Sequence, residues 1–246
     1  MLDFIFDYSE SGRWKKPFAA HDVGTYPLAN GQTYQGDMPV EETGNMLIMT
    51  TAIAIADGNA DYAAKHWEIL TAWSNYLAEA GMDPENQLCT EDFAGHLAHN
   101  ANLSAKAIMA IAGYGRLAEM LNKPEEAKKF TEMAKRMAIE WERRADDGDH
   151  YRLAFDMPGT WSQKYNFVWD KVLGLNILPD RIMKKEVTFY LKTQNKYGLP
   201  LDNRFTWGKT DDTVWSATMA DSEGDFQELI RPIWKYVNET SSRVPL

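Results

Sequence analysis

Two adjacent glutamates, Glu41 and Glu42, stand immediately before an apolar helical segment in the stretch PVEETGNMLIMTTAIAIADGN, residues 39–59. Carboxylates at such a position can stabilise the positive end of a helix dipole. They can also form half of an active site, because paired carboxyl groups can supply a general acid and a general base. Adjacent side chains at a helix entry diverge by about 100°, so we expect two different roles. Glu42 is our candidate for a binding site, and Glu41 should then fix the preceding loop by pairing with a Lys, an Arg or a backbone N–H.

Other polar residues concentrate in the long segments that precede apolar helices. Asp92 is the third catalytic candidate beside Glu41 and Glu42. The residues predicted to bind a substrate are Asp22, His99, Asn100, Trp169, Asp170, Lys171, Arg204 and Asp212. A structural interpretation stays open for several of them, because carboxylates can cap helices and a buried charge inside an apolar helix must be paired.

Several other chemistries leave no signature in the sequence. A Ser-centred elbow, a phosphate-binding glycine loop and a Cys–His pattern are all absent. His96 and His99 are three residues apart, as two metal ligands on one helical face would be, but no third ligand follows at a recognisable spacing. We therefore expect no metal and no cofactor. The chemistry that remains is carboxylate acid/base catalysis with an activated water.

Composition excludes several classes of partner. The chain has 246 residues and a formal net charge of −10, without the stripe of Lys and Arg that would neutralise phosphates, so we expect no nucleic acid. The single cysteine, Cys89, excludes an internal disulfide. No apolar run reaches the roughly 18 to 20 residues of a membrane span. The 9 Trp, 11 Tyr and 10 Phe can line both a core and a small-molecule or carbohydrate cleft.

Helical periodicity predicts four pairs of helices. In each pair the first helix is rich in Ala, Gly, Met and Ile, as a helix buried on most sides should be, and the second is amphipathic. Residues 2–10 supply what resembles the second helix of an earlier pair. The predicted pairs are 44–58 with 61–81, 102–122 with 124–145, 162–176 with 179–198, and 211–220 with 223–240.

Short connections within pairs alternate with long ones between pairs. The first helices of the pairs start near residues 43, 102, 162 and 211, a spacing typical of repeated helical hairpins. We predict an all-α fold in which residues 1–246 form a single, incomplete α/α toroid. The long loops would then converge on one aromatic, acidic cleft at the ends where the inner helices begin. An open α-solenoid that binds a protein partner is the alternative.

Five strings, HDVGTYPLANGQ, PVEETGNMLIM, EDFAGHLAHNANLSAKAI, YNFVWDKVLGL and YGLPLDNR, resemble the central helical region of the glutaminase A family. The resemblance extends over essentially the whole chain. It implies a six-hairpin, glycosidase-like toroid and hydrolysis of L-glutamine to glutamate and ammonia. It also implies a larger parent protein, exported from the cytoplasm, with β-rich domains upstream of this one. We expect the chain to be an excised part of such a protein.

The favoured function is hydrolysis of an amide on a small amino acid, with glutamine as the first substrate to test. Arg204 or Lys171 could hold the substrate carboxylate, and the remaining acids could hold its ammonium group. Two alternatives stay open: a glycoside hydrolase acting on an oligosaccharide, since paired acids in an aromatic-lined barrel also cleave sugars, and a noncatalytic module that binds carbohydrate or peptide.

Overall fold

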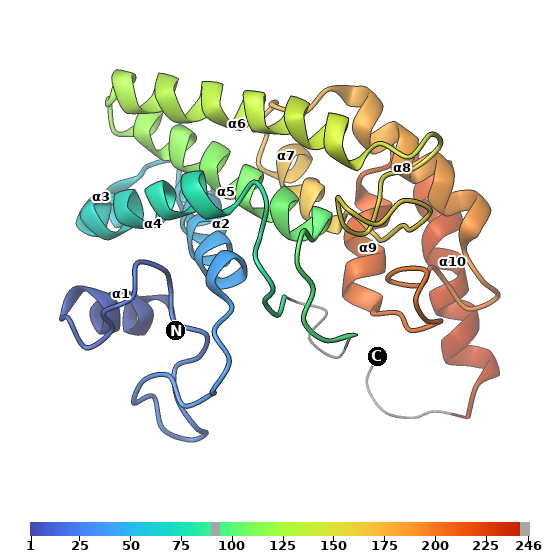
Figure 1. Cartoon of the computed structure of the whole chain (residues 1–246), viewed down its shortest axis with the longest axis horizontal. Coiled ribbons are helices and arrows are strands. Elements are labelled where there is room, and N and C mark those ends of the chain that lie inside the picture. The colour runs from blue at the N-terminus through green and yellow to red at the C-terminus, as the bar shows by residue number, and fades with distance from the viewer. Residues whose placement is uncertain (90–93, 242–246) are drawn as a thin grey trace.

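The computed structural model describes residues 1–89 and 94–241 and is built from helices (Figure 1). Within these residues the only β-type pairing consists of isolated bridges, so the predicted all-α fold is confirmed. The elements are α1 (Leu2–Glu10), α2 (Pro39–Asp57), α3 (Asp61–Lys65), α4 (Trp67–Ala80), α5 (Ala101–Met120), α6 (Pro124–Ala145), the 3₁₀ helix η2 (Tyr165–Phe167), α7 (Val168–Val172), α8 (Asp180–Thr193), α9 (Thr210–Thr218) and α10 (Glu223–Glu239). None of the described helices is long and apolar enough to span a membrane.

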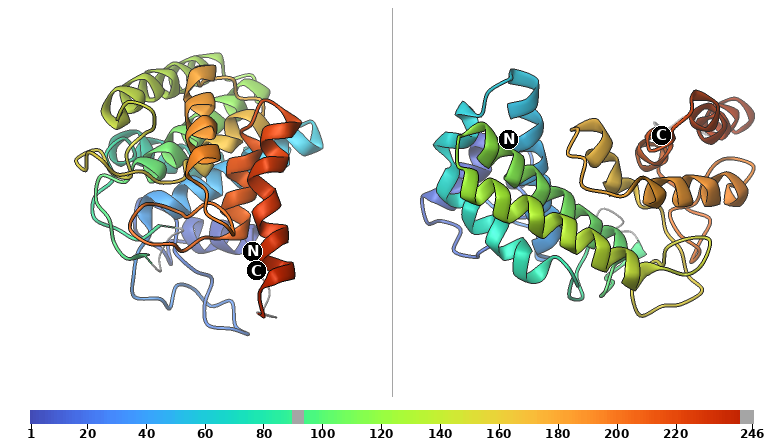
Figure 2. Two further views of the ribbon diagram at one scale, coloured as in Figure 1. Left: turned by 90° about the vertical axis from the view of Figure 1, so that its right-hand side faces the viewer. Right: turned by 90° about the horizontal axis from the view of Figure 1, so that it is seen from above.

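The four predicted helix pairs are present, and their first members lie side by side. Helix α2 packs against α5, α5 packs against η2, and η2 packs against α9. The second members lie outside this row: α4 contacts α2 and α5, α6 runs along α5, and α10 contacts α8 and α9 (Figure 2). Helix α1 contacts α4 at one end of the arrangement, and α10 lies at the other end (Figure 1).

Burial distinguishes the inner helices from the outer ones, as their composition predicts. Every residue from 101 to 115 in α5 is buried. Outer helix α6 buries one stripe that includes Phe130, Met137 and Trp141, and the Trp141 indole donates a hydrogen bond to the Ala101 carbonyl at 2.7 Å. Packing of this amphipathic stripe on an apolar inner helix therefore fixes the two layers against each other.

Three boundaries differ from the sequence-based expectation. Helix α2 begins at Pro39, so Glu41 and Glu42 lie inside its first turn and not before it; proline favours the first helical position because its missing N–H is not needed there. The third inner helix is short, since α7 ends at Val172. The outer helix predicted over 61–81 is interrupted at His66, whose ring stacks on Phe6 at 4.0 Å.

Hydrogen bonds join the long loops to the starts of inner helices and to one another. The Val40 amide at the start of α2 donates to Gln87 Oε1 at 3.0 Å, which ties the loop 81–100 to the first pair. The Ala101 amide donates to the Leu153 carbonyl at 3.0 Å, and the Gln163 amide donates to the Leu201 carbonyl at 2.7 Å. The described parts of the segments that precede α2, α5 and α9 lie on the lower side of the view in Figure 1. The residues that these loops contribute are therefore brought to one side of the molecule.

Candidate functional site

Glu41 and Lys106 form a buried ion pair between α2 and α5. The Lys106 ammonium group donates to Glu41 Oε1 at 2.5 Å, and the side chains are 5% and 3% exposed. Neither charge could be buried at this depth without a partner, because the desolvation cost would be several kcal/mol per ion. The pair connects the first turn of α2 to the second turn of α5.

Glu42 occupies a different environment from its neighbour. It is partly buried, and Asn45 Nδ2 donates to its Oε2 at 3.3 Å. Burial, and then the negative charge of Glu41, raise the pKa of Glu42 to about 7, while the hydrogen bond from Asn45 and the charges of Lys106 and His21 oppose the rise. A carboxyl group with this pKa can both take up and release a proton near neutral pH.

Asp22 organises the long loop that precedes α2. Its carboxylate accepts hydrogen bonds from the amides of Gly24, Thr33 and Tyr34 at 2.9 to 3.0 Å. Partial burial acts to raise the pKa of Asp22, but these amides and the His21 ring leave it below its ordinary value. His21 also lies close enough to Glu42 for its charge to act on that carboxyl, so Asp22 holds a loop that borders Glu42.

Asn100 and His99 flank the start of α5. Asn100 caps the helix, since its Oδ1 accepts from the amides of Asn102 at 2.9 Å and Leu103 at 3.0 Å. His99 has a positive φ of 59° and directs Nδ1 to Asp83 at 2.7 Å. It lines a cavity of about 320 Å³ whose other walls are Asp83, Arg143, Arg144, Arg152, Phe155 and Asp156. His99 is therefore engaged with Asp83 and α6, apart from the Glu41–Glu42 pair.

The His99–Asp83 contact predicts a pH-dependent contribution to stability. The hydrogen bond with Asp83 raises the pKa of His99 above its ordinary 6.5, so its stabilisation is fully present below pH 6.5 and is lost as the pH rises through the folded-state pKa. We expect His99→Asn, which tolerates a positive φ, to lower the melting temperature at about pH 6 and to leave it close to wild type at about pH 9. The effect is modest, because the His99 side chain is 43% exposed.

Thermal melts across that pH range test this expectation, with His96→Asn as the matched control, since His96 is exposed in the same loop. An equal loss of stability at both ends of the range would contradict it.

Asp170 and Lys171 are both engaged in local structure around α7. The buried Asp170 carboxylate accepts from the amides of Ile177 at 3.0 Å and Leu178 at 3.3 Å, which folds the chain back after the helix. Burial raises the pKa of Asp170, and these amides oppose the rise. Lys171 donates to the Ala220 carbonyl at the end of the fourth inner helix. These contacts join α7 to its surroundings and are not directed at Glu42.

Trp169 and Asp212 lie in α7 and α9, and Arg204 lies in the loop between the third and fourth pairs. The Arg204 guanidinium bonds Asp202 through Nη2 at 2.6 Å and the Ala94 carbonyl through Nη1 at 3.3 Å, so it links two long loops. Trp169 is half-buried, with its ring 5.5 Å from that of Trp215. Asp212 is fully buried in α9, and its Oδ2 lies 3.8 Å from the Lys209 ammonium group. The third catalytic candidate, Asp92, lies outside the described residues and stays a prediction.

Buried polar contacts link α2 to α5, α5 to η2, and α9 to Gln163, which lies two residues before η2. Besides the Glu41–Lys106 pair, the Asn166 side chain donates to the Asn102 carbonyl at 3.0 Å, and the Ser216 hydroxyl bonds Gln163 Oε1 at 2.8 Å. We call the six residues of these contacts the polar seam: Glu41, Lys106, Asn102, Asn166, Gln163 and Ser216. Five of the six are absent from the site predicted from sequence.

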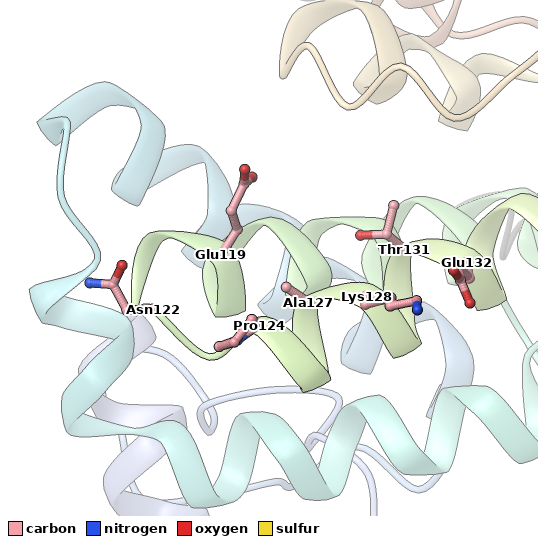
Figure 3. A pocket seen from close by; sticks show the side chains of 7 residues that line it. All are labelled: Glu119, Asn122, Pro124, Ala127, Lys128, Thr131 and Glu132. Carbon is pink, nitrogen blue, oxygen red and sulfur yellow. The ribbon is translucent and has the colours of Figure 1, made fainter.

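A larger cavity, of about 730 Å³, lies along the α5–α6 hairpin (Figure 3). Glu119, Asn122, Pro124, Ala127, Lys128, Thr131 and Glu132 line it. Glu119 belongs to the last turn of α5, at the opposite end of that helix from Lys106, and none of the predicted site residues lines the cavity. Across residues 1–89 and 94–241, no three His, Cys, Asp or Glu side chains lie close enough together to hold a metal ion.

The family comparison matches the helical architecture described above. The model of the glutaminase A six helical-hairpin domain matches residues 1–246. This chain belongs to that family. The glutaminase A family assignment agrees with the resemblance seen in the five sequence strings and with the all-α fold.

Two curated relatives of this glutaminase A family member carry glutaminase names. It is 35% identical over 247 residues to the protein named Glutaminase A of Aspergillus oryzae, covering 98% of this chain and 36% of that relative. It is 26% identical over 334 residues to the protein named "Probable glutaminase" of Arthroderma benhamiae, covering 100% of this chain and 39% of that relative. The chain thus spans little more than a third of the length of these relatives.

Lys106 is the main residue of this glutaminase A domain that sequence reasoning missed. It is the only charged residue in the run NLSAKAIMAIAGY. A single lysine in such a run is usually interpreted as a long side chain whose ammonium group reaches the surface. The available signal was its position, because Leu103, Met109 and Ala110, three or four residues away along α5, are apolar and buried. A lysine on such a face must find an acidic partner inside the protein.

Proposed function

We propose that this domain hydrolyses the side-chain amide of L-glutamine, or of a close analogue, by carboxylate acid/base catalysis centred on Glu42. The observation that supports it most strongly is the asymmetric pair in the first turn of α2. Glu41 is neutralised by Lys106 at 2.5 Å, whereas Glu42 is partly accessible and has a pKa of about 7. Two adjacent carboxyl groups with different environments can have different roles, one as a fixed charge and the other as the group that transfers a proton.

The reaction balances with water as the only co-substrate. In its ionised form, Glu42 takes a proton from a water molecule, and the water oxygen forms a bond to the amide carbon. The carbon–nitrogen bond then breaks while the nitrogen receives a proton from the carboxyl group, so that glutamate and ammonia leave. A carboxyl group with a pKa near the working pH suits both steps, because it is neither too weak a base nor too weak an acid.

The amino-acid end of the substrate requires charged partners. In this proposal Arg204 is the better candidate to hold the substrate carboxylate, since it lies on the long-loop side and links the loops that carry Asp202 and Ala94. Lys171 is the weaker candidate: both side chains already have hydrogen-bond partners, but Lys171 lies within α7, whereas Arg204 lies in a long loop. Asp92 remains the candidate for the substrate ammonium group; Asp212 would have to become exposed to take this role, because its side chain is fully buried beside Lys209.

A glycoside hydrolase is the second candidate function, and the aromatic side chains of the third and fourth pairs favour it. Trp215 lies within 5.8 Å of Tyr165 and within 5.5 Å of Trp169, between ring centroids. Phe205 and Trp207 stack at 4.1 Å and are 52% and 46% exposed on the loop before α9. Exposed aromatic rings of this kind can stack on the apolar face of a sugar.

Substrate assays on the full-length protein separate these functions. We expect ammonia release from L-glutamine, measured with a coupled dehydrogenase assay, and no reducing-sugar release from a panel of oligosaccharides. Asparagine, one methylene shorter, is the matched control and should be hydrolysed more slowly, because its amide cannot reach the same position while its amino-acid end is held. Reducing sugar without ammonia would favour the glycosidase, and ligand binding with neither product would favour a noncatalytic module.

A further inference from the structure

Lys106 is buried and contacts two polar side chains of α2, one beside Glu42 in sequence and the other hydrogen-bonded to it. It is 4% exposed in the second turn of the apolar helix α5, and its ammonium group contacts both Glu41 Oε1 at 2.5 Å and Asn45 Oδ1 at 2.7 Å. Lysine is among the residues least often fully buried. The desolvation cost of burying the Lys106 ammonium group is offset by an ion pair and a hydrogen bond, both with residues in the first two turns of α2.

Gly44 provides the space through which the Lys106 side chain reaches these partners. A Cβ atom at position 44 would lie 2.7 Å from Lys106 Cγ and 3.1 Å from Cδ. Contacts at these distances would force the lysine stem to move. Because Gly44 lies within α2, where glycine is unfavourable compared with alanine, close approach of the lysine is the physical reason for a glycine there.

Asn45 connects Lys106 to Glu42. An ammonium group can only donate hydrogen bonds, so the Asn45 oxygen must face Lys106, and the Asn45 NH₂ group is then directed to Glu42 Oε2 at 3.3 Å. Lys106 therefore acts on Glu42 by two routes. It neutralises the adjacent Glu41 charge, and it orients the amide that donates to Glu42.

We propose that Lys106 is a positioning residue for the reaction, held across Gly44 so that its ammonium group fixes both the charge of Glu41 and the orientation of the Asn45 amide that faces Glu42. This inference rests on the proposed function for its consequence in catalysis. The effect of Lys106 on the ionisation of the Glu41–Glu42 pair can be measured without any substrate.

The charged groups around Glu42 determine how removal of Lys106 should change the ionisation of the Glu41–Glu42 pair. Glu41 faces it from α2, Lys106 from α5, and His21 from the loop before α2; Glu91 and Asp92 lie outside the described residues. Without Lys106, two neighbouring carboxyl groups would share a partly buried site with less positive charge. The last proton should then leave the pair at a higher pH, by about 1 to 3 units.

The experiment compares Lys106→Met, Lys106→Arg and Gly44→Ala in the full-length protein. The first removes the charge, the second keeps it, and the third displaces the lysine without changing any charge. Gly113→Ala is the matched control, because its added Cβ would lie 2.6 Å from Thr51 Oγ1, a similar clash between the same two helices but at a different point. Carbodiimide labelling of the Glu41–Glu42 peptide, quantified by mass spectrometry across pH, reports carboxyl ionisation directly, and the pH profile of kcat/KM for glutamine reports its catalytic consequence.

We expect the labelling midpoint and the acidic limb of the rate profile to move to higher pH in Lys106→Met, by about 1 to 3 units, with at least about a fivefold loss of kcat/KM at pH 7. Gly44→Ala should shift the labelling midpoint and the acidic limb in the same direction by a smaller amount. In Lys106→Arg both should lie closer to their wild-type values than in Lys106→Met. The inference is overturned if Lys106→Met and Gly44→Ala merely lower the melting temperature, as Gly113→Ala does, with the labelling midpoint unchanged. If the wild-type protein releases no ammonia, the proposed function fails, and the labelling midpoint still decides the role of Lys106.

Discussion

Glu42→Gln in the full-length protein should lower kcat for glutamine hydrolysis about a hundredfold or more without loss of folded protein. Glutamine has nearly the shape of glutamate, but it cannot exchange a proton near neutral pH. In the structure Glu42 contacts Asn45 at 3.3 Å, an interaction that a glutamine oxygen can also accept. Initial rates of ammonia release, together with a thermal melt of the same preparation, measure both quantities.

Glu41→Gln is the matched control, because the two residues are adjacent and the substitution is the same. It leaves the buried Lys106 cation without its counter-charge, so we expect a lower melting temperature. Because the Glu41 charge raises the pKa of Glu42, its loss should also move the acidic limb of the rate profile to lower pH, while turnover of the folded protein on the plateau stays close to wild type. The roles would be reversed if Glu41→Gln abolished turnover in folded protein and Glu42→Gln only lowered its stability.

The pH dependence of stability gives Glu42 a second, activity-independent signature. Its folded-state pKa of about 7 lies above the ordinary value of 4.5, so the folded protein binds a proton between these values that the unfolded chain does not. Wild-type stability should therefore fall as the pH rises from about 4.5 to about 7. Glu42→Gln lacks this titrating group and therefore avoids the loss of stability. The difference in melting temperature between the variant and wild type should increase in favour of the variant from about pH 4.5 to about pH 7, and the variant should stay the more stable protein above pH 7.

The layers of the fold could be predicted from the sequence because each helix carries its own evidence. The near-total burial of α5 follows from its run of small and apolar residues, and the single buried stripe of α6 follows from apolar residues at helical spacing. Helix ends were less accessible to sequence reasoning. The break at His66 depends on Phe6 and Glu10, which belong to α1 and are distant along the chain, so no local pattern could indicate it.

The candidate site was predicted only where a residue's surroundings lie close to it in sequence. Glu41 and Glu42 were found because they are adjacent at a helix start, and the expected pairing of one of them with a lysine or arginine corresponds to the Glu41–Lys106 contact. The lysine itself is 65 residues away in sequence. The position of Asn100 in a loop predicts a binding role, yet its side chain accepts hydrogen bonds from two amides at the start of α5. Polar residues at helix starts can cap the helix or bind a ligand, and only tertiary contacts distinguish these two roles.

A second buried charge network, around Lys164 and Glu186, holds the loop 146–164 against the outer helix α8. The Lys164 ammonium group donates to the carbonyls of Tyr151 at 3.1 Å and Ser162 at 2.8 Å, and it lies 3.9 Å from Glu186 Oε2. Glu186 also accepts from the Tyr151 amide at 2.9 Å and from the Tyr190 hydroxyl. Lys164 and Glu186 are 0% and 1% exposed at the side chain, so solvent cannot replace either partner.

Glu186→Gln should lower the free energy of unfolding by about 3 to 5 kcal/mol, the usual cost of breaking a buried ion pair from one side. The substitution keeps the shape of the side chain and an oxygen for the Tyr151 amide, so the expected loss comes from the uncompensated Lys164 charge. For a domain of this size such a change lowers the melting temperature by about 10 °C. Chemical denaturation and thermal melts measure it, with the exposed pair Arg116–Glu119 as control, where Glu119→Gln should have little effect.

The double variant Lys164→Met, Glu186→Gln tests whether charge, and not side-chain packing, carries this cost. It removes both buried charges at once, and a neutral pair of similar volume avoids the desolvation penalty that each single variant leaves uncompensated. The double variant should therefore be more stable than the sum of the two single losses predicts, by about 1 kcal/mol or more. Strictly additive losses would mean that Lys164 and Glu186, at 3.9 Å, stabilise the loop independently through their separate hydrogen bonds. Coupled losses would instead identify the pair as the contact that holds the loop 146–164, and with it the start of η2, in place beside the polar seam.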